Sequence, residues 1–123
     1  AQGTAEANYT VVARGRLSED LSRLDQVERL YAVPRAKSGG QHFGSRLLFL
    51  PDGSLLVSIG DGGNPPAALD GAPIRNQAQN LGAAFGKVLR LTDDGKPFRD
   101  NPFFFNDTAT TEIYTLGHRN IQG

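Results

Sequence analysis

The sequence predicts an all-β protein built from short antiparallel strands, and three observations lead to this expectation. The 123 residues include 15 glycines and 7 prolines, a turn-rich composition that favours short strands over long helices. Two apolar runs flank Pro51-Asp52-Gly53, which is the pattern of a β-hairpin. The spacing of strand, Asp-Gly turn and strand over residues 46–59 recurs near 86–98, as in proteins that repeat one antiparallel sheet.

Composition limits the partners and the chemistry. Thirteen basic residues balance thirteen acidic ones, so the charge does not favour nucleic acid or an anionic membrane as a partner. The chain has no cysteine, which excludes a disulfide framework, a thiolate nucleophile and a cysteine-based zinc site. No apolar run approaches the length of about eighteen residues that a transmembrane helix needs. We expect a single domain without membrane insertion, and we interpret the start at Ala1 as that of a processed or excised segment.

The first third of the chain gives conflicting local signals. Residues 1–8 are small and polar and should form a frayed end, and residues 9–13 (YTVVA) should form a strand. Apolar residues then recur at helical spacing behind Ser18 as a cap: Leu17, Leu21, Leu24, Val27 and Leu30. Read alone, this spacing predicts a helix over residues 18–31.

The hairpin is the strongest local signal. With Asp52 and Gly53 as its two turn residues, the numbers of facing residues sum to 105. The register then contains Leu50 opposite Leu55, Leu48 opposite Val57, and Gly44 opposite Asp61. Both faces are largely apolar, so we expect both to be covered, as in stacked sheets.

The rest of the chain alternates loops and short strands. Residues 60–85 form a long irregular excursion, of a length that is usually functional or disordered. Residues 85–91 (FGKVLRL) should form a strand that turns at Asp94-Gly95, and residues 113–116 a last short strand.

His42 and Asp61 flank the hairpin and form the first candidate site. In the register above they are diagonal cross-strand neighbours, within reach of a hydrogen bond. A carboxylate that accepts from one imidazole nitrogen fixes the tautomer and leaves the other nitrogen to act as a general base. The alternative is a structural histidine that caps the mouth of the hairpin.

Residues 117–123 (GHRNIQG) hold the second candidate site. Arg119 with the adjacent Asn120 can bind a planar, polyanionic ligand through forked hydrogen-bond donation. The alternative is an arginine on the solvated surface.

Four blocks of sequence, in order, carry a resemblance to a known family: GGQHFGSRLLFLPDGSLLVSIGD, NQAQN, FGKVLRL with DGKPFRDNPF, and EIYTLGHRNIQG. Over residues 10–123 the chain resembles the soluble quinoprotein sugar dehydrogenases, also called the glucose/sorbosone dehydrogenase family. The resemblance implies a six-bladed β-propeller, of which residues 1–123 would be an internal fragment of about two blades. It also implies a strand near residues 26–33 in place of the helix, and we prefer that assignment because local propensity is a weak predictor.

The resemblance further implies an activity and a set of site residues. The family uses pyrroloquinoline quinone and calcium to oxidise the anomeric carbon of aldoses to lactones, in a periplasmic or secreted location. His42 falls on the catalytic base and Asp61 on the carboxylate that orients it. Arg119 and Asn120 fall on the pair that contacts the quinone, and Gln41 takes a substrate-facing position where some members have aspartate.

The implied mechanism has a small-molecule aldose as substrate. His42 removes the proton of the C1 hydroxyl while a hydride passes to C5 of the quinone, and Arg119 stabilises charge on the quinone oxygen. The family's calcium ligands and its other quinone ligands fall beyond Gly123, so we expect no activity from this chain alone. The resemblance leaves open which sugar is oxidised and which electron acceptor follows the quinone.

Two other functions remain as alternatives. The first is a propeller that binds a partner without catalysis, since a fold does not fix a function; such a protein would have no reason to bring His42, Asp61 and Arg119 to one pocket. The second is a calcium-dependent propeller lactonase, which would need clustered acidic ligands, and only Asp61 is suitably placed.

Residues 106–115 (NDTATTEIYT) carry a separate signal. They match the reading-frame translation of a widely used short-read sequencing adapter, and we interpret a segment between Phe103 and Thr115 as foreign to the natural gene. The alternative is an ordinary polar loop. In either case residues 106–111 are small and polar, bury little and should form a loop.

Overall fold

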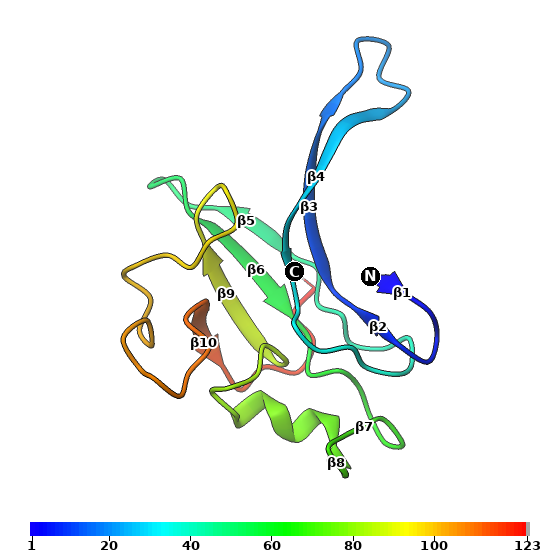
Figure 1. Ribbon diagram of the computed structural model, residues 1–123, viewed down its shortest axis with the longest axis vertical. Coiled ribbons are helices and arrows are strands. Elements are labelled where there is room, and N and C mark those ends of the chain that lie inside the picture. The colour runs from blue at the N-terminus through cyan, green and yellow to red at the C-terminus, as the bar shows by residue number, and fades with distance from the viewer. Residues whose placement is uncertain (123) are drawn as a thin grey trace.

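A four-stranded antiparallel sheet organises the molecule. In the computed structural model, which describes residues 1–122, its strands lie in the order β10-β9-β6-β5 (Figure 1). They are β5 (Leu47–Phe49), β6 (Leu55–Ile59), β9 (Lys87–Leu91) and β10 (Ile113–Leu116). Three further pairs are β1 (Gln2–Gly3) with β2 (Asn8–Tyr9), β3 (Val11–Leu17) with β4 (Leu24–Ala32), and β7 (Ala68–Leu69) with β8 (Ala72–Pro73). The 3₁₀ helix η1 (Ile74–Gln79) is the one helical element among the described residues, so the all-β expectation is confirmed.

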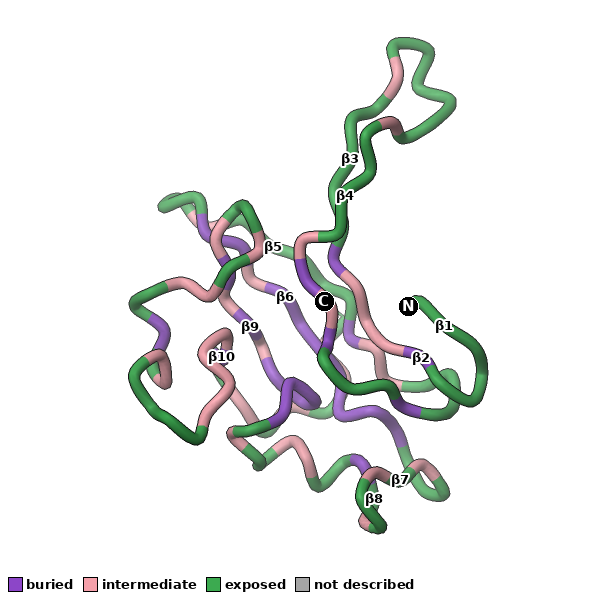
Figure 2. Tube along the Cα trace, viewed as in Figure 1, coloured by how far each residue is buried: buried purple, intermediate pink, exposed green. Residues whose placement is uncertain are grey.

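The core lies around the two central strands, β6 and β9. Branched aliphatic side chains fit a pleated, buried surface, and Figure 2 shows both strands buried along most of their length. The side chains that are at most 2% exposed include Leu55, Val57, Ile59, Leu89, Leu91 and Ile113. β6 therefore gives rigid support to the residues that follow it, beginning with Gly60 and Asp61.

Residues 11–32 form a long hairpin instead of a helix. β3 pairs antiparallel with β4, so the helix predicted over residues 18–31 is wrong, and the strand expected near residues 26–33 is confirmed with slightly earlier bounds. Leu21 has a φ of +59°, a left-handed conformation that an α-helix excludes. Its side chain is 71% exposed, so the apolar spacing does not mark a buried helical face.

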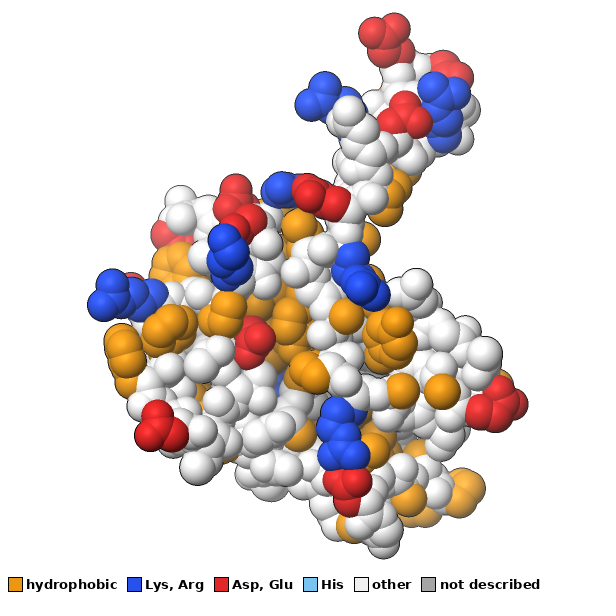
Figure 3. Space-filling model, in the orientation of Figure 1, with side chains coloured by type: hydrophobic (Ala, Val, Ile, Leu, Met, Phe, Trp, Pro, Cys, Tyr) orange, Lys and Arg blue, Asp and Glu red, His pale blue; other side chains and the backbone are white. Residues whose placement is uncertain are grey.

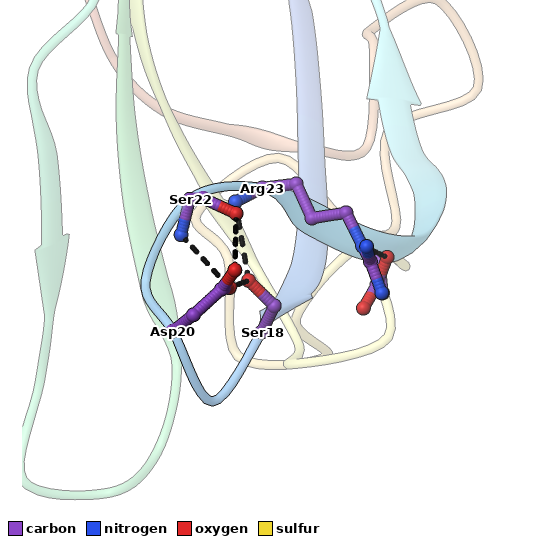
Figure 4. Close-up of polar contacts among 5 residues, drawn as sticks. Ser18, Asp20, Ser22 and Arg23 are labelled. Carbon is purple, nitrogen blue, oxygen red and sulfur yellow. Dashed lines mark hydrogen bonds and ion pairs between the residues drawn. The ribbon is translucent and has the colours of Figure 1, made fainter.

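Polar hydrogen bonds hold the tip of this hairpin, which projects from the body of the molecule and carries charges of both signs (Figures 1 and 3). Ser18 Oγ donates to Asp20 Oδ1 at 2.6 Å, and the N–H of Arg23 donates to Ser18 Oγ at 3.1 Å (Figure 4). Ser22 donates to the same carboxylate through its N–H and its hydroxyl. Ser18 therefore closes a turn, as serine and aspartate commonly do, and caps no helix.

The central hairpin forms one residue away from the expected register. The observed pairs are Leu47 with Val57, Leu48 with Leu56, and Phe49 with Leu55. The turn contains three residues, 51–53: the N–H of Gly53 (φ +82°) donates to Leu50 O, and the N–H of Leu50 donates to Ser54 O. This shift exchanges the two faces of β5. All three β5 side chains are at least 50% exposed, so the expected cover on both faces is wrong for this strand.

The second Asp-Gly turn repeats the first. The N–H of Gly95 (φ +81°) donates to Thr92 O, as Gly53 does in the first turn. Directly after the turn Pro97 forms an isolated bridge with Leu91, and residues 98–112 contain no strand. Two other regions are more regular than expected: residues 60–85 contain β7, β8 and η1, and residues 1–8 contain β1 and the start of β2.

Residues 106–111 form successive turns, as expected, and the foreign origin of residues 106–115 stays a prediction. Within residues 1–122, no helix combines the length and apolar character that membrane crossing requires.

Candidate functional site

The expected contact between His42 and Asp61 is present. His42 Nδ1 lies 2.7 Å from Asp61 Oδ1, and the two side chains are only 14% and 8% exposed. Because an ionised carboxylate can only accept, Nδ1 donates its proton and Nε2 carries the lone pair. Asp61 Oδ1 also accepts from the N–H of Gly63 at 3.0 Å, which fixes the carboxylate in place.

Two glycines allow this contact. His42 lies in the loop before β5 with a φ of +51°, and Asp61 follows β6. A Cβ on Gly60 would lie 2.0 Å from His42 O, and a Cβ on Gly44 would lie 2.4 Å from Ser58 O. The loop therefore approaches the end of β6 to a distance that only glycine permits.

Residues 119–121 join this loop to β6 and its extension. Three hydrogen bonds connect them: Asp61 N–H to Arg119 O at 2.7 Å, Gly44 N–H to Asn120 Oδ1 at 3.1 Å, and Ser58 Oγ–H to Ile121 O at 2.9 Å. The structure thus brings Arg119 and Asn120 beside the His42–Asp61 pair, although they lie far along the chain.

A hollow of about 510 Å³ opens beside Asp61 and Arg119. Its polar lining consists of Asp61, Asn64, Arg75, Asn76, His118 and Arg119. Arg119 Nη2 donates to Asn64 Oδ1 at 3.4 Å. Sequence reasoning did not identify Asn64, Arg75 or Asn76 as site residues. The signal in the sequence is the NQAQN block of the family resemblance, which begins at Asn76.

Gln41 lies at a second, smaller hollow. This hollow measures about 310 Å³, and its lining includes Gln41, Asn64, Pro65 and Pro66. Asn64 belongs to both hollows, so they adjoin each other. Gln41 precedes His42 in the chain and lies outside the hollow that contains Arg119. Of the pair His42 and Asp61, only Asp61 lines one of these two hollows.

Lys87 supports one wall of the larger hollow from within the core. Its side chain is fully buried, and Nζ donates to the carbonyls of Gln77, Ala78 and Phe85 at 2.8 to 2.9 Å. These bonds hold the end of η1, the helix that carries Arg75. Burial lowers the pKa of Lys87 to about 8. From the sequence, Lys87 was expected only to lie in a strand.

A second buried lysine, Lys37, lies within electrostatic range of the carboxylate. Its Nζ donates to Gly39 O at 3.0 Å and lies 4.0 Å from the centroid of the Phe43 ring. Burial lowers the pKa of Lys37, and the charge of Asp61 acts in the opposite direction. The positive charge of Lys37 therefore contributes to the environment of the carboxylate that orients His42.

The donors of the larger hollow fit a planar, polyanionic cofactor. Pyrroloquinoline quinone presents carboxylates and ring carbonyls, which the forked donors of Arg75 and Arg119 and the amide of Asn76 can bind. Calcium finds no comparable site: the described part of the chain holds no group of three or more His, Cys, Asp or Glu residues that could hold a metal ion. Because calcium takes six to eight oxygen ligands, its ligands remain an expectation about residues outside this chain.

Sequence comparison identifies a family and relatives of this chain. The family model described as Glucose / Sorbosone dehydrogenase matches residues 1–123. An uncharacterised protein of Synechocystis is 52% identical over 121 residues, 98% of this chain and 29% of that protein. The aldose sugar dehydrogenase of Escherichia coli is 38% identical, over 93% of this chain and 28% of that protein. The quinoprotein glucose dehydrogenase B of Acinetobacter calcoaceticus is 35% identical, over 94% of this chain and 25% of that protein.

Solved structures of the same kind superpose on the chain. The apo form of the soluble aldose sugar dehydrogenase of Escherichia coli matches 89% of this chain with a TM-score of 0.75 and 35% identity. The aldose sugar dehydrogenase of Streptomyces coelicolor, solved with PQQ bound, matches 96% with a TM-score of 0.64 and 27% identity. The chain spans 29% and 30% of those two proteins. These are β-propeller proteins, and the expectation of a propeller fragment is confirmed.

Proposed function

The chain belongs to the glucose/sorbosone dehydrogenase family, and from this premise we propose that its site takes part in oxidising the anomeric carbon of an aldose to a lactone, with pyrroloquinoline quinone as the oxidant. The names of the relatives support a sugar as substrate. The quinoprotein relative and the PQQ-bound neighbour support the cofactor. Since the chain spans 29% or less of these relatives, the proposal concerns the steps that its own residues perform.

The contact between His42 and Asp61 carries the proposal. With Nδ1–H held by the carboxylate at 2.7 Å, Nε2 is the basic atom and takes the proton of the sugar's O1 hydroxyl. The C1 hydrogen leaves with its electron pair as a hydride, and the C1–O1 bond becomes the carbonyl of the lactone. Asp61 remains ionised and stabilises the imidazolium that forms.

Arg119 and Asn120 are the proposed quinone-binding residues. When bound, pyrroloquinoline quinone supplies the two-electron acceptor for the hydride. Arg119 lines the 510 Å³ hollow with Arg75, and their guanidinium groups would hold an anionic cofactor through paired N–H donors. Asn120 does not line this hollow; its assignment follows the family resemblance, by which its amide nitrogen would add a third donor. We derive no step through calcium.

Gln41 is the proposed sugar contact. Its amide both donates and accepts, which suits the hydroxyl groups of a sugar, and its 310 Å³ hollow adjoins the one that Arg119 lines. Following the family resemblance, we place the protein in the periplasm or outside the cell. Fractionation of cells that express the complete gene tests this location, and recovery in the cytoplasmic fraction would contradict it.

A chimera provides the test of the reaction. This chain replaces the matching segment of the Escherichia coli aldose sugar dehydrogenase, which it covers at 38% identity, and turnover of aldoses is measured with the quinone supplied. We expect His42→Asn to lower turnover by about two to four orders of magnitude while quinone binding persists. Arg119→Ala should weaken quinone binding. Normal turnover in the His42→Asn chimera would refute the assignment of the base.

A further inference from the structure

We propose that Asn120 is a positioning residue for His42: its side-chain carbonyl fixes the loop that presents the imidazole to Asp61, apart from any contact of its amide nitrogen with a cofactor. The inference rests on the proposed function in taking His42 as the base. It goes beyond the proposed function by giving the side-chain carbonyl of Asn120 a task of its own, holding the His42 loop, and leaving cofactor contact to the amide nitrogen.

The loop that carries His42 has a backbone that must be held. His42 has a φ of +51°, Gly44 of +75° and Ser45 of +89°. For His42 and Ser45 these left-handed angles are unfavourable, and such angles persist where the surrounding structure enforces them. Strained backbone of this kind is concentrated at functional sites.

Two side chains bond the backbone of this loop: Thr10 Oγ1 donates to Phe43 O at 3.3 Å, and Asn120 accepts from Gly44, the residue that contacts the end of β6 most closely. The N–H of Gly44 donates to Asn120 Oδ1 at 3.1 Å, and the N–H of the next residue, Ser45, donates to the carbonyl of Ser58 at 3.0 Å. The bond to Ser58 joins two backbones, so it tolerates substitution, whereas the bond to Asn120 depends on the identity of residue 120. Gly44 is buried, so loss of Oδ1 leaves a buried N–H without its acceptor.

Asn120 also lies outside the set of described residues that line the 510 Å³ hollow, although its neighbour Arg119 is among them. Its carbonyl is directed at the His42 loop, which leaves the amide nitrogen as the end able to donate elsewhere. Asparagine and aspartate share the acceptor and differ in the donor. Asn120→Asp therefore keeps the restraint and removes the donor, whereas Asn120→Ala removes both.

The experiment is NMR on the ¹⁵N-labelled chimera described above, without quinone. Two signals are read: hydrogen exchange of the Gly44 amide, and the ¹⁵N shifts of the His42 ring, which report the Nδ1–H tautomer. Asn80→Ala is the matched control, because Asn80 Oδ1 accepts from the N–H of Gly82 at 2.9 Å, a bond of the same type outside the His42 loop.

We expect Asn120→Ala to speed exchange of the Gly44 amide by about tenfold and to replace the single tautomer of His42 with a mixture. Asn120→Asp should restore both signals, and Asn80→Ala should leave both unchanged. A single Nδ1–H tautomer in Asn120→Ala overturns the proposal, as does failure of Asn120→Asp to restore it. Because no quinone or turnover enters this measurement, its outcome is independent of the turnover assay that tests the base.

Discussion

The backbone N–H of Asp61 donates a 2.7 Å hydrogen bond to the carbonyl of Arg119. The residue that orients the proposed base and the residue proposed to bind the cofactor are thus joined through the main chain. A displacement of either segment is transmitted to the other, so proton removal and cofactor binding share one rigid support.

Removing the charge of Asp61 should weaken the base. Asp61→Asn keeps the size of the side chain and an acceptor for Nδ1–H but no longer stabilises the imidazolium. In the chimera we expect turnover to fall by about two orders of magnitude or more, with quinone affinity little changed. Equal losses in turnover and quinone affinity would indicate collapse of the segment that contains Arg119 and would contradict this role.

Adding a methyl group at Gly44 should destabilise the fold. The new Cβ would lie 2.4 Å from Ser58 O, at a residue with a φ of +75°, so we expect Gly44→Ala to lower the free energy of unfolding by about 2 to 4 kcal/mol. Gly53→Ala is the control: its φ is +82° but nothing lies within 4 Å of the added Cβ, and backbone strain alone costs about 1 to 2 kcal/mol. Urea unfolding of both variants checks the difference, which equal losses would rule out.

Lys87 should make stability depend on pH. Its pKa is about 8 in the folded chain against 10.5 for a free lysine. Below pH 8 both states are charged and the burial penalty is complete; between pH 8 and 10.5 only the unfolded chain keeps the proton, so the free energy of unfolding rises with pH. We expect the difference between wild type and Lys87→Met in urea unfolding to grow in favour of wild type across this window.

Lys96 should affect the pH dependence of stability in the opposite direction to Lys87. Its hydrogen bond with Asp94 raises its pKa, so its contribution to stability should be lost as pH rises above 10.5. A wild-type advantage over Lys87→Met that stays constant from pH 8 to 10.5 would show that the buried ammonium does not titrate in this range.

The 123-residue chain by itself should not oxidise aldoses, even with quinone and calcium supplied. Two or three charge-assisted contacts contribute roughly 3 to 9 kcal/mol before the cost of association, about 4 kcal/mol or more, whereas micromolar binding needs a net of about 8 kcal/mol. An assay with an artificial electron acceptor checks this. Turnover above that of free quinone would show that the residues of this chain suffice.

The conformation of Leu21 gives a prediction that separates turn from helix. Leu21 has a φ of +59° and is 71% exposed. Leu21→Gly should therefore raise the free energy of unfolding by about 1 kcal/mol, because glycine adopts this angle without strain. In a helix the same change would lower it by about 1 kcal/mol. Thermal or urea unfolding reads the sign directly.

The sequence allowed the His42–Asp61 contact to be predicted because both residues flank one hairpin. A hairpin brings its two ends together even when its register is shifted by one residue, so the error in register left this contact intact. The length of the turn could not be predicted, because the same Asp-Gly pair occurs in two-residue and three-residue loops.

Other parts of the site depend on contacts between distant segments. Asn120 lies 76 residues from Gly44, and only the family resemblance could connect them. Arg75 reaches the hollow on η1, which is held by the buried ammonium of Lys87. Nothing in the local pattern of FGKVLRL distinguishes a lysine that points into the core from one on the surface.

On a ribosome, Gly44 is synthesised well before Asn120, because 76 residues separate them. At about 5 to 20 residues per second this interval is roughly 4 to 15 seconds, whereas a hairpin such as β5–β6 pairs in about 1 to 10 microseconds. The nascent chain can therefore form its first strands while the loop that bears His42 still lacks its distant acceptor. A chain that ends before residue 120 would contain much of the sheet, but the loop of His42, the proposed base, would lack its acceptor on Asn120.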